Sequence, residues 1–192
     1  SEYYRDYAKR DPFEFMPETY NVTTQSNMSQ NKEILTSPLT EGIWIVKPGE
    51  NSNRGRGIRI FTSVEKIYRF LEQKAGEQWI IQKYIHNPIL IGGPFWNNTP
   101  LRKFDIRMFG LAQIVEGSIL GATRIMSAHK TSSYEFNLLD LEDRDVHLTN
   151  DAVQDRNEEY GKYEAGNKIS QKDFSTFLKQ TKNVDFSEVI WP

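Results

Sequence analysis

The segment spanning residues 42–61 constrains the fold more than any other part of this chain. An apolar run ends at Lys47, a loop rich in Gly, Asn, Ser and Arg follows, and a second apolar run ends at Phe61. β-Branched and aromatic residues dominate both runs, so the pattern predicts a strand pair over 43–47 and 57–61. A sheet aims a lysine at a strand end, and a loop with little side-chain bulk can bring backbone N–H groups onto anionic oxygens. The segment therefore predicts a phosphate site, with ATP as the first candidate.

Composition places the chain among globular proteins and excludes several partners. Of its 192 residues 38% are hydrophobic, including 11 Phe, 9 Tyr and 4 Trp, which is enough for a core. Lys and Arg total 24 against 26 for Asp and Glu, so no net basic field attracts nucleic acid or lipid. No run approaches the roughly 18 apolar residues of a membrane helix. We expect neither nucleic acid nor a membrane as a partner, and the absence of cysteine excludes disulfides.

Two helices are predicted from apolar spacing and capping residues. Apolar residues at i, i+3, i+4 and i+7 follow Thr62 and Ser63, which predicts a helix to about residue 74. A capping box that begins at Ser170 predicts a helix near the end of the chain. That helix should bury three apolar side chains: Phe174, Phe177 and Leu178.

Other segments are predicted to be strands or loops. Strands are expected over residues 78–85, 104–115 and 118–126, the last two as a hairpin around a Glu-Gly turn. Residues 92–100, rich in Gly, Asn and Pro, are expected to form a loop. Residues 145–148 are expected to be a short extended piece.

A second group of charged residues lies at 102–107. On a continuous strand, the period of two places Lys103, Asp105 and Arg107 on one face. Two cations and a carboxylate on one surface suit a site for phosphate and substrate. The same pattern fits a solvated sheet face with cross-strand ion pairs, so both interpretations stay open.

For the remaining polar groups the pattern also allows a purely structural role. Residues 82–84 end a strand with an amide, an ammonium and a phenol, which suit a purine and its ribose but also a strand leaving the core. Arg54 and Arg56 fit a solvated loop tip as well as a phosphate cover. His147 fits a structural histidine better than a ligand, and residues 149–150 fit a helix N-cap.

Several motifs, in unbroken order from about residue 42 to 182, resemble the tubulin–tyrosine ligase family of ATP-grasp enzymes. They are Trp-Ile-Val-Lys-Pro with Arg-Gly-Arg-Gly-Ile, Ile-Gln-Lys-Tyr-Ile, Arg-Lys-Phe-Asp-Ile-Arg, His-Leu-Thr-Asn, and Tyr-Gly-Lys-Tyr-Glu-Ala-Gly-Asn-Lys. The last motif and the Arg-Lys pair resemble the tyrosine-adding member more than the polyglutamylases and glycylases of the family.

This resemblance assigns nucleotide contacts to the first half of the chain. It implies that Lys47 contacts the α-phosphate of ATP. It implies that a loop folds over the phosphates, formed by Arg54, Gly55, Arg56, Gly57 and Ile58. It also implies that four consecutive residues line the adenine pocket: Gln82, Lys83, Tyr84 and Ile85.

The resemblance assigns the chemistry to residues further along the chain. Lys103 and Asp105 would lie by the ribose and the substrate. Arg107 would steady the transferred phosphoryl group together with Arg124, although the residues around Arg124 depart from the family pattern. The pocket would be completed by two further residues: Thr149 and Asn150.

The family joins an amino acid to the C-terminal tail of tubulin through an acyl phosphate made from ATP. The resemblance thus implies an ATP-dependent carboxylate–amine ligase with tubulin and a free amino acid, tyrosine first, as partners. Fixed Arg and Lys donors stabilise the phosphoryl charge, so no side-chain nucleophile is needed. The alternatives are a polyglutamylase or glycylase of the same family and a noncatalytic tubulin-binding module.

The resemblance also implies Mg²⁺, which the family holds with an Asp and a Glu-x-Asn pair on late strands. The one Glu-x-Asn here, at residues 135–137, precedes the His-Leu-Thr-Asn motif, whereas the family's ligands follow it. We therefore interpret it as a coincidence and expect no metal ligand in this chain. The isolated chain is accordingly expected to be inactive, with the metal region beyond Pro192.

The expected fold is α+β, of the ATP-grasp type. Residues 1–41 would be the end of an N-terminal region and a linker, residues 42–88 the central nucleotide-binding lobe, and residues 89–192 an incomplete C-terminal lobe. The resemblance places the protein in the cytoplasm, on the cytoskeleton or in a cilium.

Overall fold

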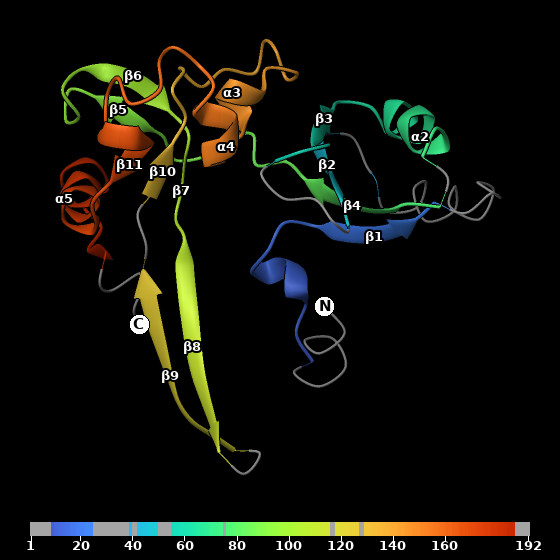
Figure 1. Cartoon of the computed structure of the whole chain (residues 1–192), viewed down its shortest axis with the longest axis horizontal. Helices are drawn as coiled ribbons and strands as arrows, with labels where there is room; N and C mark the ends of the chain where they lie inside the picture. Colours follow the sequence, from blue (N-terminus) through green and yellow to red (C-terminus); the bar gives the residue numbers. More distant parts are fainter. Residues whose placement is uncertain are drawn as a thin grey trace. The chain divides into compact units, whose positions relative to one another are not determined.

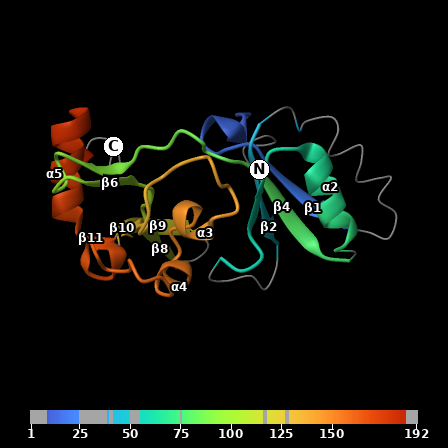
Figure 2. The same cartoon turned by 90° about the horizontal axis from the view of Figure 1, so that it is seen from above.

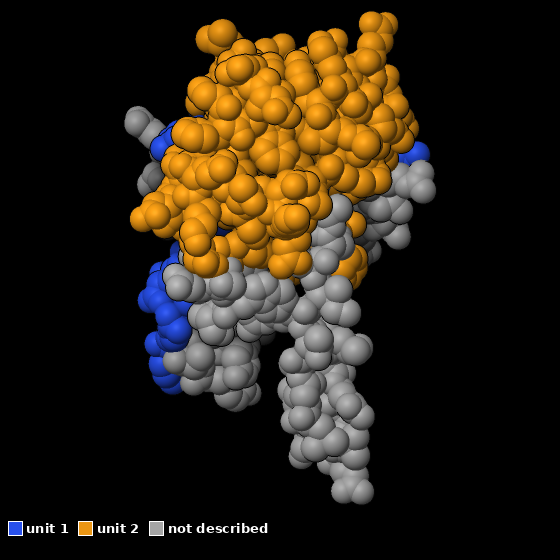
Figure 3. Space-filling model, turned by 90° about the vertical axis from the view of Figure 1, so that its left-hand side faces the viewer, with its two compact units in different colours: residues 1–88 blue, residues 89–192 orange. Residues whose placement is uncertain are grey.

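The computed structural model describes residues 9–24, 39, 42–49, 55–74, 76–115, 118–126 and 129–186, and only the backbone path from 110 to 129. The chain divides into two compact units, residues 1–88 and residues 89–192 (Figure 3). Each unit has its own apolar core.

The first unit is built on a four-stranded antiparallel sheet, preceded by the short helix η2 (Pro12–Glu14). Its strand order is β1 (Thr19–Thr23), β4 (Gln78–Lys83), β2 (Trp44–Pro48) and β3 (Arg59–Phe61). The predicted strand pair around the basic loop is confirmed, because β2 and β3 pair with Trp44 opposite Phe61. The third strand is also confirmed, although it ends at Lys83 and β1 from the N-terminal region pairs with it.

Helix α2 (Val64–Glu72) covers one face of this sheet (Figure 2). Its Ile67 and Leu71 are fully buried against side chains that alternate along the strands: Val22, Trp44, Val46, Trp79 and Ile81. Because successive strand residues point to opposite faces, the residues between them face away from α2. The second face therefore carries Thr19, Ile45, Lys47 and Gln82.

The second unit contains two hairpins and a small sheet. β5 (Ile91–Gly93) pairs with β6 (Thr99–Arg102), and a three-stranded sheet has the order β11 (Lys168–Ile169), β10 (His129–Thr131) and β7 (Phe104–Asp105). The predicted hairpin is confirmed as β8 (Met108–Val115) with β9 (Ser118–Met126), and it projects from the rest of the unit (Figure 1).

The helices of the second unit lie in its second half. They are α3 (Arg144–His147), α4 (Asp151–Gln154), the single turn η3 (Ala165–Asn167) and α5 (Gln171–Lys182). The capping box is confirmed, since Ser170 Oγ accepts a hydrogen bond from the Asp173 N–H at 3.1 Å. As predicted, α5 buries Phe174, Phe177 and Leu178, and Phe104 packs on the same cluster.

Two predictions of local structure are only partly correct. Of residues 145–148 only Leu148 is extended, because Asp143 caps a helical turn over 144–147 with its carboxylate accepting from the Asp145 N–H at 2.9 Å. The loop predicted over residues 92–100 is present at 94–98, with positive φ at Asn97 and Asn98, but its two ends lie in the paired strands β5 and β6. Gly92 allows the strands to meet, since a Cβ there would lie 2.1 Å from the Pro100 carbonyl oxygen.

None of the helices in the described part of the chain is both long enough and apolar enough to span a membrane.

Candidate functional site

Lys47 lies on the face of the first sheet that α2 leaves uncovered. Its Nζ donates a hydrogen bond to Gln82 Oε1 at 2.7 Å, and Gln82 Nε2 donates to Thr19 Oγ1 at 2.8 Å. Burial lowers the pKa of Lys47, because a half-buried ammonium loses hydration. An anion bound on the same face would stabilise this ammonium, because it would compensate for the lost hydration.

The loop after β2 returns to the sheet through a glycine turn. Gly55 and Gly57 have φ of 72° and 74°, and a Cβ on Gly57 would lie 2.7 Å from Pro48 Cγ. Arg56 is exposed between them, and Ile58 is half-buried. The predicted phosphate cover is therefore a tight turn next to the end of β2, whereas its Arg54 lies outside the described residues.

The three residues after Gln82 have different surroundings. Lys83 Nζ lies 4.6 Å from the centre of the Trp44 ring, an arrangement that stabilises a cation. Tyr84 is 3% exposed, its N–H donates to the Ile43 carbonyl at 2.9 Å, and burial raises the pKa of its phenol to about 12. Ile85 is 55% exposed. Lys83 and Tyr84 thus pack against other residues of the first unit. Of the three, Ile85 is the one with an exposed apolar side chain.

In the second unit the structure brings Lys103, Asp105 and Thr149 together. Thr149 Oγ1 donates to Asp105 Oδ2 at 3.0 Å, and Lys103 Nζ donates to the His147 carbonyl oxygen at 3.1 Å. Asp105 Oδ1 also accepts from the Lys130 N–H at 3.3 Å. The motifs at 102–107 and 147–150 therefore form one polar cluster, with the carboxylate of Asp105 at its centre.

The continuous strand assumed for residues 103–107 is not present. Lys103 lies between β6 and β7, and residues 106–107 separate β7 from β8. Arg107 is exposed. Arg124 pairs through its backbone with Gly110 in the β8–β9 hairpin, and its side chain lies outside the described part.

Asn150 begins helix α4 as its N-cap residue. Its carbonyl oxygen accepts from the N–H groups of Val153 and Gln154 at 2.8 and 3.0 Å. Its side chain is half-buried and makes no capping hydrogen bond to the described first turn of α4. The interpretation of this position as a helix start is confirmed, and it does not conflict with a role in binding.

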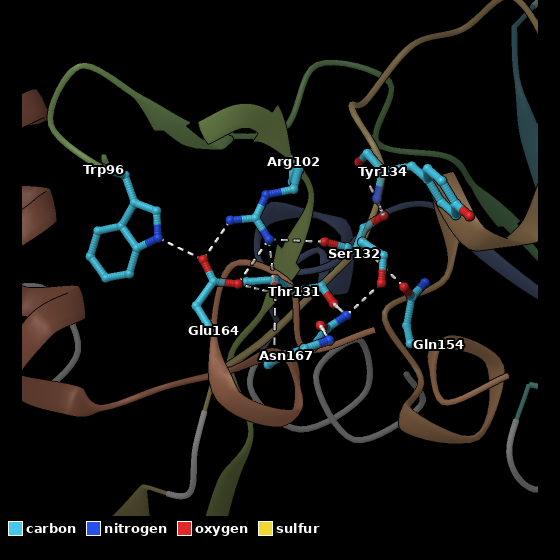
Figure 4. A network of polar contacts seen from close by, with 10 residues as sticks. Trp96, Arg102, Thr131, Ser132, Tyr134, Gln154, Glu164 and Asn167 are labelled. Carbon is cyan, nitrogen blue, oxygen red and sulfur yellow. Dashed lines mark hydrogen bonds and ion pairs between the residues drawn. The ribbon is translucent and has the colours of Figure 1, made fainter. Parts of the chain in front are cut away.

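A buried ion pair that contacts Thr131 of β10 was not predicted. Arg102 is fully buried, and its Nη1 donates to Glu164 Oε2 at 2.8 Å. Trp96 Nε1 and Thr131 Oγ1 donate to the same carboxylate at 2.6 and 3.0 Å (Figure 4). Burial alone would raise the pKa of Glu164, but the hydrogen bonds from Arg102 and Trp96 outweigh it and hold the pKa below its ordinary value.

Two buried amides extend this network (Figure 4). Asn167 Nδ2 donates to Ser133 Oγ at 2.8 Å, and its Oδ1 accepts from the Gly161 N–H at 2.7 Å. Gln154 Nε2 donates to the Leu148 carbonyl oxygen at 2.7 Å, and its Oε1 accepts from the Ser133 N–H at 2.8 Å. The backbone next to Thr149 is therefore held at the Leu148 carbonyl by the buried amide of Gln154.

His147 has a structural environment, as its pattern suggested. The residue is 2% exposed, and its Nε2 lies 2.9 Å from the Asp140 carbonyl oxygen. A carbonyl oxygen only accepts, so Nε2 carries the proton. Burial is the largest cause that lowers the pKa of His147, and the nearby Lys103 adds to it.

The sequence matches the model of the tubulin-tyrosine ligase family over residues 2–191. The chain belongs to the tubulin-tyrosine ligase family. The family model covers nearly the whole chain, including the N-terminal region that supplies β1 and Thr19.

Tubulin glycylases are among the relatives with curated names. Tubulin glycylase 3B of Tetrahymena thermophila is 39% identical over 155 residues, which are 78% of this chain and 12% of that protein. Tubulin glycylase 3C of the same organism is 28% identical over 93% of this chain and 16% of that protein. Tubulin glycylase 3B of Drosophila melanogaster is 36% identical over 61% of this chain and 14% of that protein. The chain therefore spans less than a fifth of the length of each.

The family resemblance implies two ligands, ATP and Mg²⁺. The described residues fit the first of them better than the second. The Lys47 ammonium, half-buried on the sheet face opposite α2, suits the anionic phosphates of ATP. Among the described residues no group of three or more His, Asp or Glu could hold a metal ion. At residues 135–137, Asn137 Oδ1 accepts from the Leu139 N–H at 3.0 Å, so its amide is used within its own loop.

Proposed function

We propose that the protein carrying this chain is an ATP-dependent ligase that joins an amino acid to tubulin. The single observation that carries the proposal is the Lys47 ammonium, which is half-buried on the sheet face opposite α2 and oriented by Gln82. A cation in this position favours an anionic ligand over a neutral one. Family membership and the names of the relatives support the choice of ATP and tubulin.

The roles of the residues follow from their charge and position. ATP supplies the phosphoryl group that activates a carboxylate of tubulin. Lys47 would hold phosphate oxygens, and Arg56 and the glycine turn would offer a charge and backbone N–H groups nearby. Asp105 would accept from a hydroxyl or ammonium group of the bound molecules, in an orientation fixed by Thr149. Arg107 and Arg124 are proposed to stabilise the charge of the transferred phosphoryl group.

The amino acid is proposed to be glycine. The motifs of the sequence favour tyrosine, but the relatives reported above are named glycylases, and none of those names supports tyrosine. The glycylase alternative therefore replaces tyrosine in the proposal. Oxygen ligands for Mg²⁺ are proposed to come from outside the described residues.

The amino acid can be tested by offering labelled glycine, glutamate and tyrosine in parallel to the complete protein with ATP and tubulin. Incorporation of glycine above the other two supports the proposal. Incorporation of tyrosine or glutamate alone would refute the choice of glycine and keep the ligase. Binding to tubulin without any ATP-dependent incorporation would identify a noncatalytic tubulin-binding module instead.

A further inference from the structure

A chain of hydrogen bonds runs from Lys47 to the backbone before β1. Lys47 Nζ donates to Gln82 Oε1 at 2.7 Å, and Gln82 Nε2 donates to Thr19 Oγ1 at 2.8 Å. Thr19 Oγ1 in turn donates to the Pro17 carbonyl oxygen at 2.7 Å. All four residues belong to the first unit, and Thr19 lies directly opposite Gln82 in the antiparallel pair of β1 and β4.

The two ends of this series of hydrogen bonds allow only one orientation of the Gln82 amide. The Pro17 carbonyl can only accept, so it takes the single hydroxyl proton of Thr19. The hydroxyl oxygen is then left to accept, and it accepts from the NH₂ group of Gln82. The amide oxygen consequently faces Lys47, whose ammonium can only donate. The direction of every bond is thus fixed by chemistry.

We propose that Thr19 is a positioning residue, which fixes the Gln82 amide and through it the Lys47 ammonium in the orientation that receives a nucleotide phosphate. This inference rests on the proposed function of Lys47. It adds to the site a residue of β1, outside residues 42–88 and outside the motifs of the sequence. Gln82 uses its oxygen toward Lys47 and one N–H toward Thr19, and in this proposal it acts on the nucleotide through Lys47.

Removal of the Thr19 hydroxyl should free the amide to rotate. In Thr19→Val the β-branched shape suited to a strand is kept, but the acceptor for Gln82 Nε2 is lost. The ammonium still attracts the amide oxygen, but the amide has lost its second anchor, so Gln82 can leave its rotamer and Lys47 no longer has an acceptor in a fixed position. Thr19→Ser keeps a hydroxyl at the same position, so it should restore the amide orientation.

The matched control is Thr23→Val. Thr23 lies four residues along the same strand and on the same face as Thr19, and it is exposed opposite Gln78. The substitution is chemically identical, and it changes β-propensity equally, but it lies at the far end of the strand from Gln82. Any effect of placing valine in β1 will appear in this variant as well.

The experiment measures the dissociation constant of MgADP by calorimetry with the complete protein. Thr19→Val should weaken MgADP binding about five- to tenfold, as the loss of one hydrogen bond to a charged site predicts. Thr19→Ser should recover most of this affinity, and Thr23→Val should bind MgADP like the wild type. The side-chain amide resonances of Gln82 should shift in Thr19→Val and keep their positions in Thr23→Val.

The outcomes separate the inference from the function on which it rests. If Lys47→Met loses MgADP and Thr19→Val binds it like the wild type, the positioning role of Thr19 is wrong and the nucleotide site stands. If Thr19→Val and Thr23→Val weaken binding equally, the effect belongs to the strand and the inference is also wrong. If Lys47→Met binds MgADP as tightly as the wild type, the proposed site itself is refuted.

Discussion

The hydroxyl of Thr149 donates to the carboxylate of Asp105 at 3.0 Å, across 44 residues of sequence. This bond joins two motifs that are separate in the chain into one cluster of the second unit. A hydroxyl has a single proton, and here that proton is directed at one carboxylate oxygen, Oδ2. The other oxygen accepts from the Lys130 N–H, so the carboxylate is held from two sides.

Thr149→Val tests whether this orientation of Asp105 matters for the reaction. The loss of a hydrogen bond to a charged group should lower kcat/KM at least about tenfold. Thr149→Ser keeps the donor and should lose much less activity. Thr176→Val, on the exposed side of α5, serves as the matched control and should leave the rate of amino acid incorporation unchanged. Equal rates for Thr149→Val and the wild type would contradict the prediction.

Glu164→Gln should destabilise the second unit strongly. It leaves the fully buried Arg102 without its counter-charge, and breaking a buried pair from one side costs about 3–5 kcal/mol. The control is Glu159→Gln, which breaks the exposed pair with Lys162 and should cost under about 1 kcal/mol. Urea unfolding measures both values. Similar decreases in the free energy of unfolding for the two variants would contradict the prediction that the buried Arg102–Glu164 pair matters more for stability.

Acid should destabilise the protein in part through His147. Because burial holds its pKa in the folded state below the value of 6.5 in an unfolded chain, the unfolded state binds more protons as pH falls through that range. Stability is therefore lost on acidification below about pH 6.5. His147→Gln keeps an N–H donor for the Asp140 carbonyl and should show a smaller loss between about pH 7.5 and about pH 5.5. The control variant His86→Gln, at an exposed position, should lose as much stability over this pH range as the wild type.

Two serines at helix starts should differ in their contribution to stability. Ser170 accepts from the Asp173 N–H at 3.1 Å, whereas Ser63 makes no side-chain capping bond to the described first turn of α2. Ser170→Ala should lower the free energy of unfolding by about 1 kcal/mol, and Ser63→Ala should lower it less. Chemical denaturation followed by circular dichroism checks the order. A larger loss for Ser63→Ala would contradict the capping geometry.

The sequence predicted the elements that local patterns specify. Strands β2, β3 and β4 and helices α2 and α5 follow from β-branched runs, apolar spacing and capping residues. The partly wrong prediction at residues 145–148 has a local cause. Val146 and Leu148 alternate with polar residues as in a strand, but the carboxylate of Asp143 caps a helical turn. A pattern of four residues is too short to separate the two.

The candidate site could be predicted only in part. Lys47, Gln82, Asp105 and Thr149 stand out as motif residues, and the structure places them in two polar clusters, one in each unit. The partners that hold them could not be predicted. Thr19 lies 63 residues from Gln82, and Arg102 lies 62 residues from Glu164. The residues next to an Arg or a Thr do not specify a partner so far along the chain, because such pairs form only through tertiary packing.

The most direct test of the account is the rate of ATP-dependent incorporation of labelled glycine into tubulin by wild type and by Lys47→Met. Lys47→Met removes the ammonium and keeps an unbranched apolar side chain, so kcat/KM for ATP should fall at least about tenfold. Lys66→Met, on the exposed side of α2, controls for the loss of one positive charge and should retain the wild-type rate. Incorporation by Lys47→Met at the rate of the wild type would contradict the assignment of this sheet face as the nucleotide site.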